Sequence, residues 1–288
     1  MGKSVLKAGS PEEVFQTAKI DYTHLVVVGS TDSSNFGCQF PVTPTDYLRY
    51  ARLDFKEGQQ RGLINALSNA KRCIDCLIES VLRSLGIAPH NIPNTALTFC
   101  NTILHGKEKA LVPLNLRLFS ALGLAPSFLI SEVRLLRNKV EHEYEIPESD
   151  DVLKAIEVSE LLLNTVKAKE LYSDSIEITD TKRQPGLPKV SDHITGIYFG
   201  YQYDAEGEND RSFYLNTSID EQKDIGYKFR GDEIEFFFLL RAMFIASHDE
   251  TSLEETIRLM LQQMKLKTPK EHINVAQVYV AGFYRHSR

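Results

Sequence analysis

The stretch SFLISEVRLLRNKVEHEY, residues 127–144, decides how this chain of 288 residues is expected to fold. Its apolar residues recur at steps of three and four, the pattern of an amphipathic helix: Leu129, Ile130, Val133, Leu136 and Val140. The same helix carries Arg137, Asn138 and His142. At about 100° per residue, Asn138 and His142 share a face, whereas Arg137 lies about 140° from His142. The long arginine side chain can still reach the cleft of His142 if a second helix closes over both.

These three residue types suit the cleavage of a phosphodiester bond. A histidine can accept or donate a proton near neutral pH. A guanidinium group can hold phosphate oxygens and the charge that develops on them, and an asparagine can orient either partner by hydrogen bonds. The alternative interpretation is a solvated helix face, on which Glu141 and Glu143 pair with the neighbouring cations.

The order of Arg137, a polar residue, three further residues and then His142, late in a helix, resembles the R-x4-6-H motif of the HEPN superfamily. The resemblance covers roughly residues 45–173. It implies a bundle of four or five helices and a metal-independent ribonuclease without a cofactor, acting as a dimer whose two motifs face each other. Arg137, Asn138 and His142 would then be the catalytic residues. Some members of the superfamily have lost catalysis and only bind or scaffold.

The segments around the motif also predict helices. Apolar periodicity and helix-ending glycines or prolines delimit four helices upstream, at about residues 45–56, 59–85, 94–105 and 114–122. Pro147 interrupts the chain after the motif, and a further helix is expected over residues 150–172. Two helices joined by a short loop usually pack antiparallel. We therefore expect His142 at the tip of a helical hairpin, next to solvent.

The character of the chain changes after a polar segment with two prolines and a glycine, residues 179–192. Residues 194–203 and 211–219 alternate in polarity and predict a β-hairpin, whose aromatic residues we interpret as packing on a helix rather than stacking on bases. Residues 234–246 fit either a buried strand or a helix, whereas residues 251–265 predict a helix and residues 273–283 a strand.

The predicted fold class is therefore α+β, with an all-α bundle followed by a small α+β domain that contains an antiparallel sheet. The predicted division of the chain is as follows: residues 1–44 form an N-terminal extension with one short strand and a loop, residues 45–178 the HEPN-like bundle, residues 179–192 a linker, and residues 193–288 an α+β accessory domain.

Composition narrows the class of protein. A net charge of −6 and 42% hydrophobic residues are typical of a globular protein and give no basic surface for tight nucleic-acid binding. This argues less against a nuclease that contacts a few phosphates in a local cleft. No apolar run reaches membrane-spanning length, and we expect no membrane partner and a cytoplasmic location. The four cysteines complete no zinc set, and the C-x2-C of Cys73 and Cys76 is interpreted as core thiols.

The leading functional prediction is a metal-independent endoribonuclease of HEPN type. By resemblance, its partners are an RNA substrate, a second copy of the chain and a cognate inhibitor or activator protein, in a toxin or antiphage defence system. A second hypothesis is a non-catalytic dimeric interaction, scaffold or regulatory protein. A third is a metal-dependent hydrolase built on Asp75, Glu79 and the Glu141-His142-Glu143 cluster. For Asp75 and Glu79 we favour an ion-paired surface, because cations lie nearby on the same helix.

Overall fold

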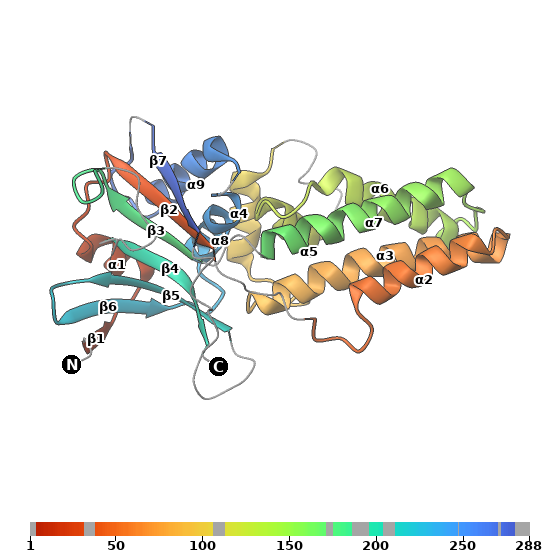
Figure 1. Ribbon diagram of the computed structural model, residues 1–288, viewed down its shortest axis with the longest axis horizontal. Helices are drawn as coiled ribbons and strands as arrows, with labels where there is room; N and C mark the ends of the chain where they lie inside the picture. Colours follow the sequence, from red (N-terminus) through yellow and green to blue (C-terminus); the bar gives the residue numbers. More distant parts are fainter. Residues whose placement is uncertain are drawn as a thin grey trace, which may run out of the picture. The chain divides into compact units, whose positions relative to one another are not determined.

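The computed structural model describes residues 4–31, 38–105, 113–170, 175–185, 196–203, 211–246, 248–269 and 272–279. The chain forms two compact units (Figure 1). Residues 35–169 make the first, here called the helical unit. Residues 1–34 and 170–288 together make the second, here called the sheet unit. The predicted α+β class is confirmed.

The described helices of the helical unit are, in chain order, α2 (Pro44–Lys56), α3 (Gln60–Ser84), α4 (Asn94–Ile103), α5 (Leu114–Ala121), α6 (Ser127–His142) and α7 (Ser149–Glu170). Helices α2, α3 and α7 run side by side in Figure 1. Thr43 and Asp46 form a capping box that starts α2. Gly86 ends α3 at a φ of 74°, which a residue without Cβ adopts at little cost.

The core of the helical unit lies around α3. Its apolar face buries Leu67, Ile74 and Ile78, and Phe99 of α4 and Phe119 of α5 are equally buried. The hydroxyl of Ser159 on α7 donates to the carbonyl oxygen of Ala70 on α3 at 3.0 Å, deep in the core. The predicted helices are thus present with ends shifted by a few residues, because each boundary depends on local capping and breaking signals.

The sheet unit contains a seven-stranded mixed sheet in the order β1-β6-β5-β4-β3-β2-β7. The strands are β1 (Ser4–Lys7), β2 (Leu25–Thr31), β3 (Ser175–Asp180), β4 (Ile197–Tyr203), β5 (Arg211–Ser218), β6 (Lys223–Lys228) and β7 (Asn274–Tyr279). The pairs β1–β6 and β2–β7 are parallel, and the other pairs are antiparallel. The antiparallel sheet that the sequence predicted is therefore only the middle of a larger mixed sheet.

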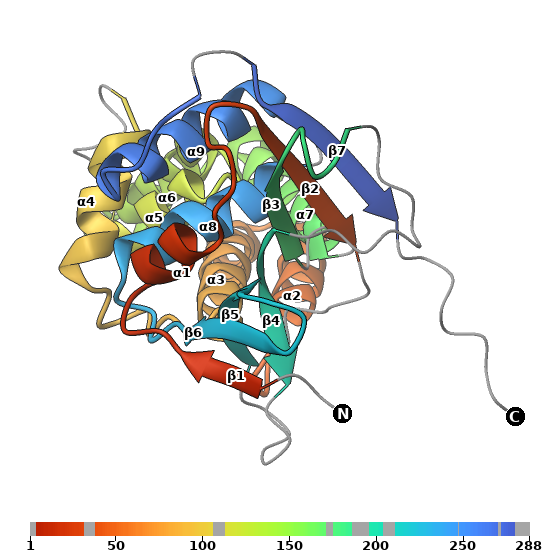
Figure 2. The ribbon, with the colours of Figure 1, turned by 90° about the vertical axis from the view of Figure 1, so that its left-hand side faces the viewer.

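Within the described part of the sheet unit, three helices accompany the sheet: α1 (Pro11–Thr17), α8 (Ile234–Ile245) and α9 (Glu250–Gln263), the last two side by side (Figure 2). Residues 234–246, ambiguous in the sequence, form α8. The ring of Phe236 on α8 lies 5.3 Å from that of Phe213 and 6.4 Å from that of Phe199, both buried in the sheet. For these two aromatic residues the packing interpretation is confirmed.

The structure corrects the predicted division of the chain in two places. Residues 1–44 are not merely an extension, because β1 and β2 are strands of the sheet and Val28 pairs with Glu177 of β3. Residues 175–180 form β3, a central strand, although the sequence was divided there between the bundle and a linker. Strand pairing between distant segments leaves no local signal, so the sequence of β2 alone indicates only an isolated strand.

None of the described helices combines the length and the apolar character needed to cross a membrane.

Candidate functional site

The predicted site residues occupy the last two turns of α6. The helix ends at His142, and the backbone N–H of Glu143 caps it by donating to the carbonyl oxygen of Lys139 at 2.9 Å. Tyr144 then reverses the chain at a φ of 57°, a left-handed conformation that is uncommon for a residue with a side chain. Helix α7 begins at Ser149, so the motif lies at the predicted turn between two helices.

The inner side of α6 is fixed to α3 by packing and by a charged contact. Val133 and Val140 are buried. The guanidinium of Arg134 donates to the carboxylate of Asp75 on α3 at 3.2 Å, and Lys71 pairs with the same carboxylate. The side chains of Arg134 and Asp75 are about one quarter exposed, so water screens this contact less than a surface pair. It holds the motif helix in register on α3.

Arg137 is held within its own helix. Its guanidinium forms an ion pair with the carboxylate of Glu141 one turn later and lies 3.5 Å from the side-chain oxygen of Asn138. About one quarter of the Arg137 side chain is exposed. The pairing with Glu141 agrees with the alternative interpretation of this face. Among the described residues, Arg137 forms no hydrogen bond with His142.

His142 and Asn138 lie on the exposed side of α6. In the part of the chain that the structure describes, the His142 ring has no hydrogen bond and no ion pair. Phe128 and Leu135, at heptad spacing before His142, are also exposed, with 69% and 60% of their surface accessible. Residues seven apart on a helix stand almost in line. This set of Phe128, Leu135, Asn138 and His142 is here called the outer stripe of α6.

The two candidate carboxylates of α3 lie beside basic side chains. Asp75 is paired with Arg134 and Lys71, as described, and Glu79 lies 3.8 Å from the Nε2 atom of His90. Across the described ranges, no group of three or more His, Cys, Asp or Glu side chains is arranged to hold a metal ion. For Asp75, the ion-paired interpretation is confirmed.

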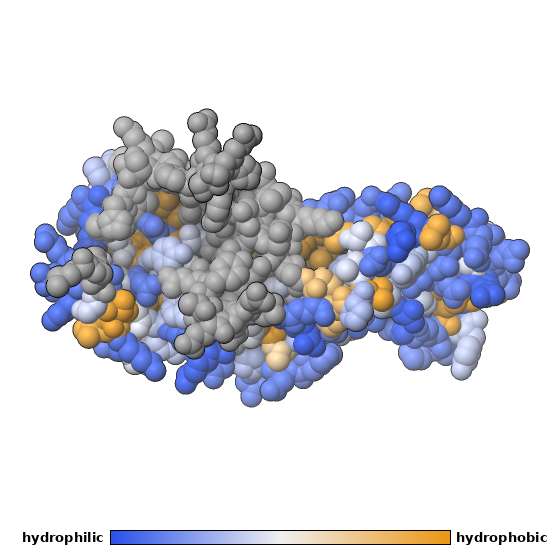
Figure 3. All heavy atoms as spheres, turned by 60° about the horizontal axis from the view of Figure 1, so that its bottom comes forward, coloured by the Kyte–Doolittle hydropathy of each residue, from blue (hydrophilic) through white to orange (hydrophobic). Residues whose placement is uncertain are grey.

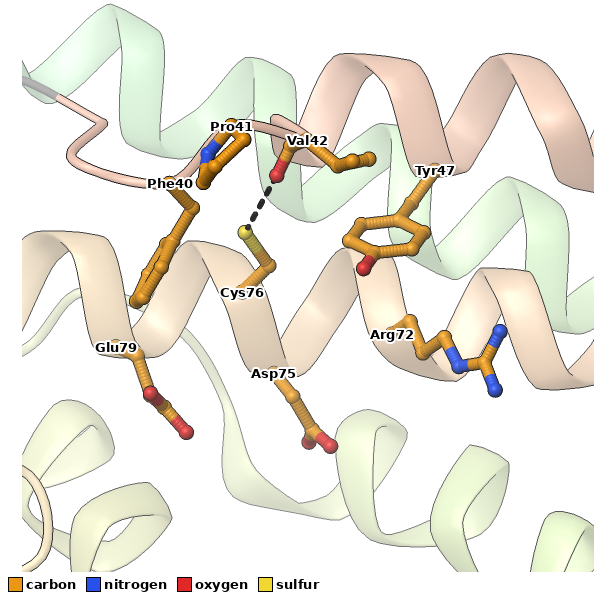
Figure 4. Close-up of a pocket in the computed structure, with 8 residues that line it drawn as sticks. All are labelled: Phe40, Pro41, Val42, Tyr47, Arg72, Asp75, Cys76 and Glu79. Carbon is orange, nitrogen blue, oxygen red and sulfur yellow. Dashed lines mark hydrogen bonds between the residues drawn. The ribbon is translucent and has the colours of Figure 1, made fainter.

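The structure adds a cavity that the sequence did not indicate. It has a volume of about 360 Å³ and is lined by Phe40, Pro41, Val42, Tyr47, Arg72, Asp75, Cys76 and Glu79. Figure 4 shows its wall, the segment of Phe40, Pro41 and Val42, passing over Cys76 on α3. Of the two thiols predicted to lie in the core, Cys73 is buried, whereas Cys76 is only half-buried. A cavity formed by a loop folded onto a helix has no periodic signal in the sequence.

A second group missed by the sequence analysis is Glu177, in the middle of β3. Burial raises the pKa of this carboxyl to about 7, and its Oε2 atom has no hydrogen-bond partner among the described residues. Val28 on β2 and Tyr198 on β4 are the residues that pair with it. The alternation of residues 175–179 would have identified the strand, but it was assigned to the end of the bundle.

Comparison of the chain with protein-family models, with curated proteins and with solved structures finds no significant match.

Proposed function

We propose that this protein is a metal-independent endoribonuclease that acts as a homodimer and uses Arg137, Asn138 and His142. The proposal rests on the exposure of His142 and, within the described residues, on its unpaired ring. It lies at the end of α6, is exposed beside Asn138, and has no partner for its ring among the described residues. A general acid or base must have a nitrogen free to meet the substrate. A histidine that serves only to fill the core would instead be buried.

The proposed reaction is an internal transesterification of RNA. A histidine nitrogen takes the proton of the ribose 2′-hydroxyl, and the 2′-oxygen attacks the adjacent phosphorus atom. The bond from phosphorus to the 5′-oxygen breaks, and that oxygen receives a proton from a second acid. The products are a 2′,3′-cyclic phosphate and a 5′-hydroxyl. Arg137 holds the charge that develops on the phosphate oxygens, and Asn138 orients the reacting groups.

The homodimer supplies what one copy lacks. A single site holds one histidine, whereas the reaction needs one group to take a proton and another to give one. The outer stripe of α6 offers a surface for a second copy, because Phe128 and Leu135 expose large apolar side chains in line with His142. On the face of the helical unit in Figure 3, apolar side chains form small separate patches among hydrophilic ones. Two stripes packed together would place two His142 rings at one interface.

A second candidate is a non-catalytic dimeric scaffold or regulatory protein. The ion pair of Arg137 with Glu141 favours it, because a guanidinium already bound to a carboxylate must be released before it can bind phosphate.

The leading proposal includes a biological role. By the resemblance, the nuclease would act in a toxin or antiphage system, with a cognate inhibitor or activator protein.

The two candidates are separated by the chemistry of the product. A DNA oligonucleotide with one internal ribonucleotide is incubated with the protein in EDTA, beside an all-DNA control. The nuclease proposal predicts a single cut after the ribonucleotide, leaving a 2′,3′-cyclic phosphate, and no cut in DNA. Cleavage of the all-DNA strand would refute a 2′-hydroxyl mechanism. An intact ribonucleotide strand, together with intact single-stranded and structured RNA, would favour the scaffold.

A further inference from the structure

Two thiols of the helical unit lie close to one turn of α3, the turn from Cys76 to Ser80. Cys38 is exposed and precedes α2 in the chain, whereas Cys76 is half-buried on α3. The hydroxyl of Ser80 lies 3.4 Å from the sulfur of Cys38 and donates to the backbone oxygen of Cys76 at 2.7 Å. The two side chains are also close enough for Cys38 to contribute to the raised pKa of Cys76. The sulfurs are therefore neighbours, although they are far apart in the sequence.

The segment that carries Cys38 is held against α3 along its length. The Phe40 ring lies under the guanidinium of Arg83, 5.4 Å from its central carbon. The Cys76 thiol donates to the backbone oxygen of Val42 at 3.6 Å, which Figure 4 marks with a dashed line. At the far end, the capping box of Thr43 and Asp46 fixes the start of α2. The approach of the two thiols is thus built into the fold.

We propose that Cys38 and Cys76 form a reversible disulfide when the protein meets a peroxide. The thiolate of Cys38 attacks one oxygen of hydrogen peroxide, so that an S–O bond forms, the O–O bond breaks and hydroxide leaves, and Cys38 becomes a sulfenic acid. The sulfur of Cys76 then attacks the sulfur of Cys38. The S–S bond forms, the hydroxyl group leaves, and it takes the Cys76 proton to become water. In total, two thiols and one hydrogen peroxide give one disulfide and two waters.

The environments of the two thiols set this order of events. Cys38 is exposed and meets the oxidant first. Burial and the neighbouring Cys38 raise the pKa of Cys76 to about 12, so Cys76 stays protonated and unreactive toward solvent peroxide until a sulfenic acid forms beside it. The disulfide would tie the cavity wall, Phe40 to Val42, to the floor at Cys76. The cavity would then have a fixed shape in the oxidised protein and an adjustable one in the reduced protein.

The test is made on the 288-residue chain, which is reduced and then treated with hydrogen peroxide. Titration of thiols in denaturant should fall from four to two, the number four being the cysteine content of the chain. Dithiothreitol should restore all four. Cys73 and Cys76 lie in one tryptic peptide, after Arg72, so the bridge is mapped by mass spectrometry in the Cys73→Ala variant. That variant removes a buried thiol one turn away and should still lose two thiols.

Two further variants define the order of the reaction. Cys76→Ser should leave Cys38 as a sulfenic acid that dimedone traps, and Cys38→Ser should resist the oxidant. A bridge that includes Cys73 or Cys100, a bridge between two copies of the chain, or oxidation of Cys38 to sulfinic acid without any bridge would each overturn the proposal. None of these outcomes depends on ribonuclease activity.

Discussion

The guanidinium of Arg137 forms an ion pair with the carboxylate of Glu141, one turn later on α6. The residue assigned to phosphate binding is therefore occupied by an internal anion. In the proposed nuclease, a phosphate that binds Arg137 competes with Glu141, and the free energy of that exchange would lower the affinity for RNA.

Removing this internal anion should improve cleavage. In Glu141→Gln the guanidinium no longer has a charged competitor, and we expect kcat/KM for RNA to rise about 2- to 5-fold, the worth of a partly exposed ion pair. Glu143→Gln makes the same change of charge at an exposed neighbour without the ion pair and serves as the control. If Arg137 has only a structural role, kcat/KM of Glu141→Gln should equal that of Glu143→Gln or be lower.

The outer stripe of α6 should be the dimer interface. Leu135→Asp places a charge on it, and we expect the protein to become monomeric and to lose cleavage, because the composite site is then incomplete. Leu53→Asp on α2 is the matched control, since Leu53 is 55% exposed and Leu135 60% exposed. Light scattering after gel filtration gives the oligomeric state. A Leu135→Asp protein that stays dimeric, or a wild type that is already monomeric, would contradict this interface.

The contact of Asp75 with Arg134 should matter for stability and not for metal chemistry. Asp75→Asn leaves two partly buried cations without a charged partner, which should cost about 1–2 kcal/mol of unfolding free energy in urea. Glu160→Gln removes a more exposed pair between α7 and Arg52 of α2 and should cost less than about 1 kcal/mol. Folded Asp75→Asn should still cut RNA. Loss of cleavage without loss of stability would instead favour the metal-dependent hydrolase, in which Asp75 binds the metal.

Glu177 should make the sheet unit less stable as the pH rises. The folded state holds its proton up to about pH 7, whereas an unfolded chain releases it near the ordinary value of 4.5. The folded state therefore binds more protons between these values, and stability falls across that window by up to about 3 kcal/mol. Glu177→Gln should flatten this slope in urea unfolding, and the exposed Glu221→Gln should not. Parallel slopes in all three proteins would show that Glu177 is not protonated in the fold.

The helical unit could be predicted well because its signals are local. The motif helix was expected over residues 127–144 and is found at Ser127–His142; the long helix expected over residues 59–85 is Gln60–Ser84. Capping boxes, αL glycines and a 3.6-residue period lie within a few residues of the structure that they specify. Helix α8 could not be distinguished from a strand, because it lacks such a local signal. Residues 235–240 are all buried, so no polar face reveals the 3.6-residue periodicity of a helix.

The sheet unit and the cavity required information that is not local. The pairing of β2 with β3 joins Val28 to Glu177 across the whole helical unit in sequence. The cavity wall depends on Phe40 and Val42 lying on α3, which no spacing indicates. For the candidate site, the end of α6 and the exposure of His142 follow from the sequence, as does Glu141 as one partner considered for Arg137. The structure is needed to show that Arg137 pairs with Glu141 and that the apolar residues of the outer stripe are exposed.

The proposed nuclease is tested most directly by RNA cleavage in EDTA, comparing the wild type with His142→Ala and His90→Ala and identifying the product ends. His90 is an exposed histidine of the helical unit outside the motif and is the control. We expect the wild type and His90→Ala to cut RNA in EDTA and to leave 2′,3′-cyclic phosphates, and His142→Ala to cut about 100-fold more slowly or not at all. Equal cleavage by His142→Ala, or wild-type cleavage that stops in EDTA, would contradict the proposal.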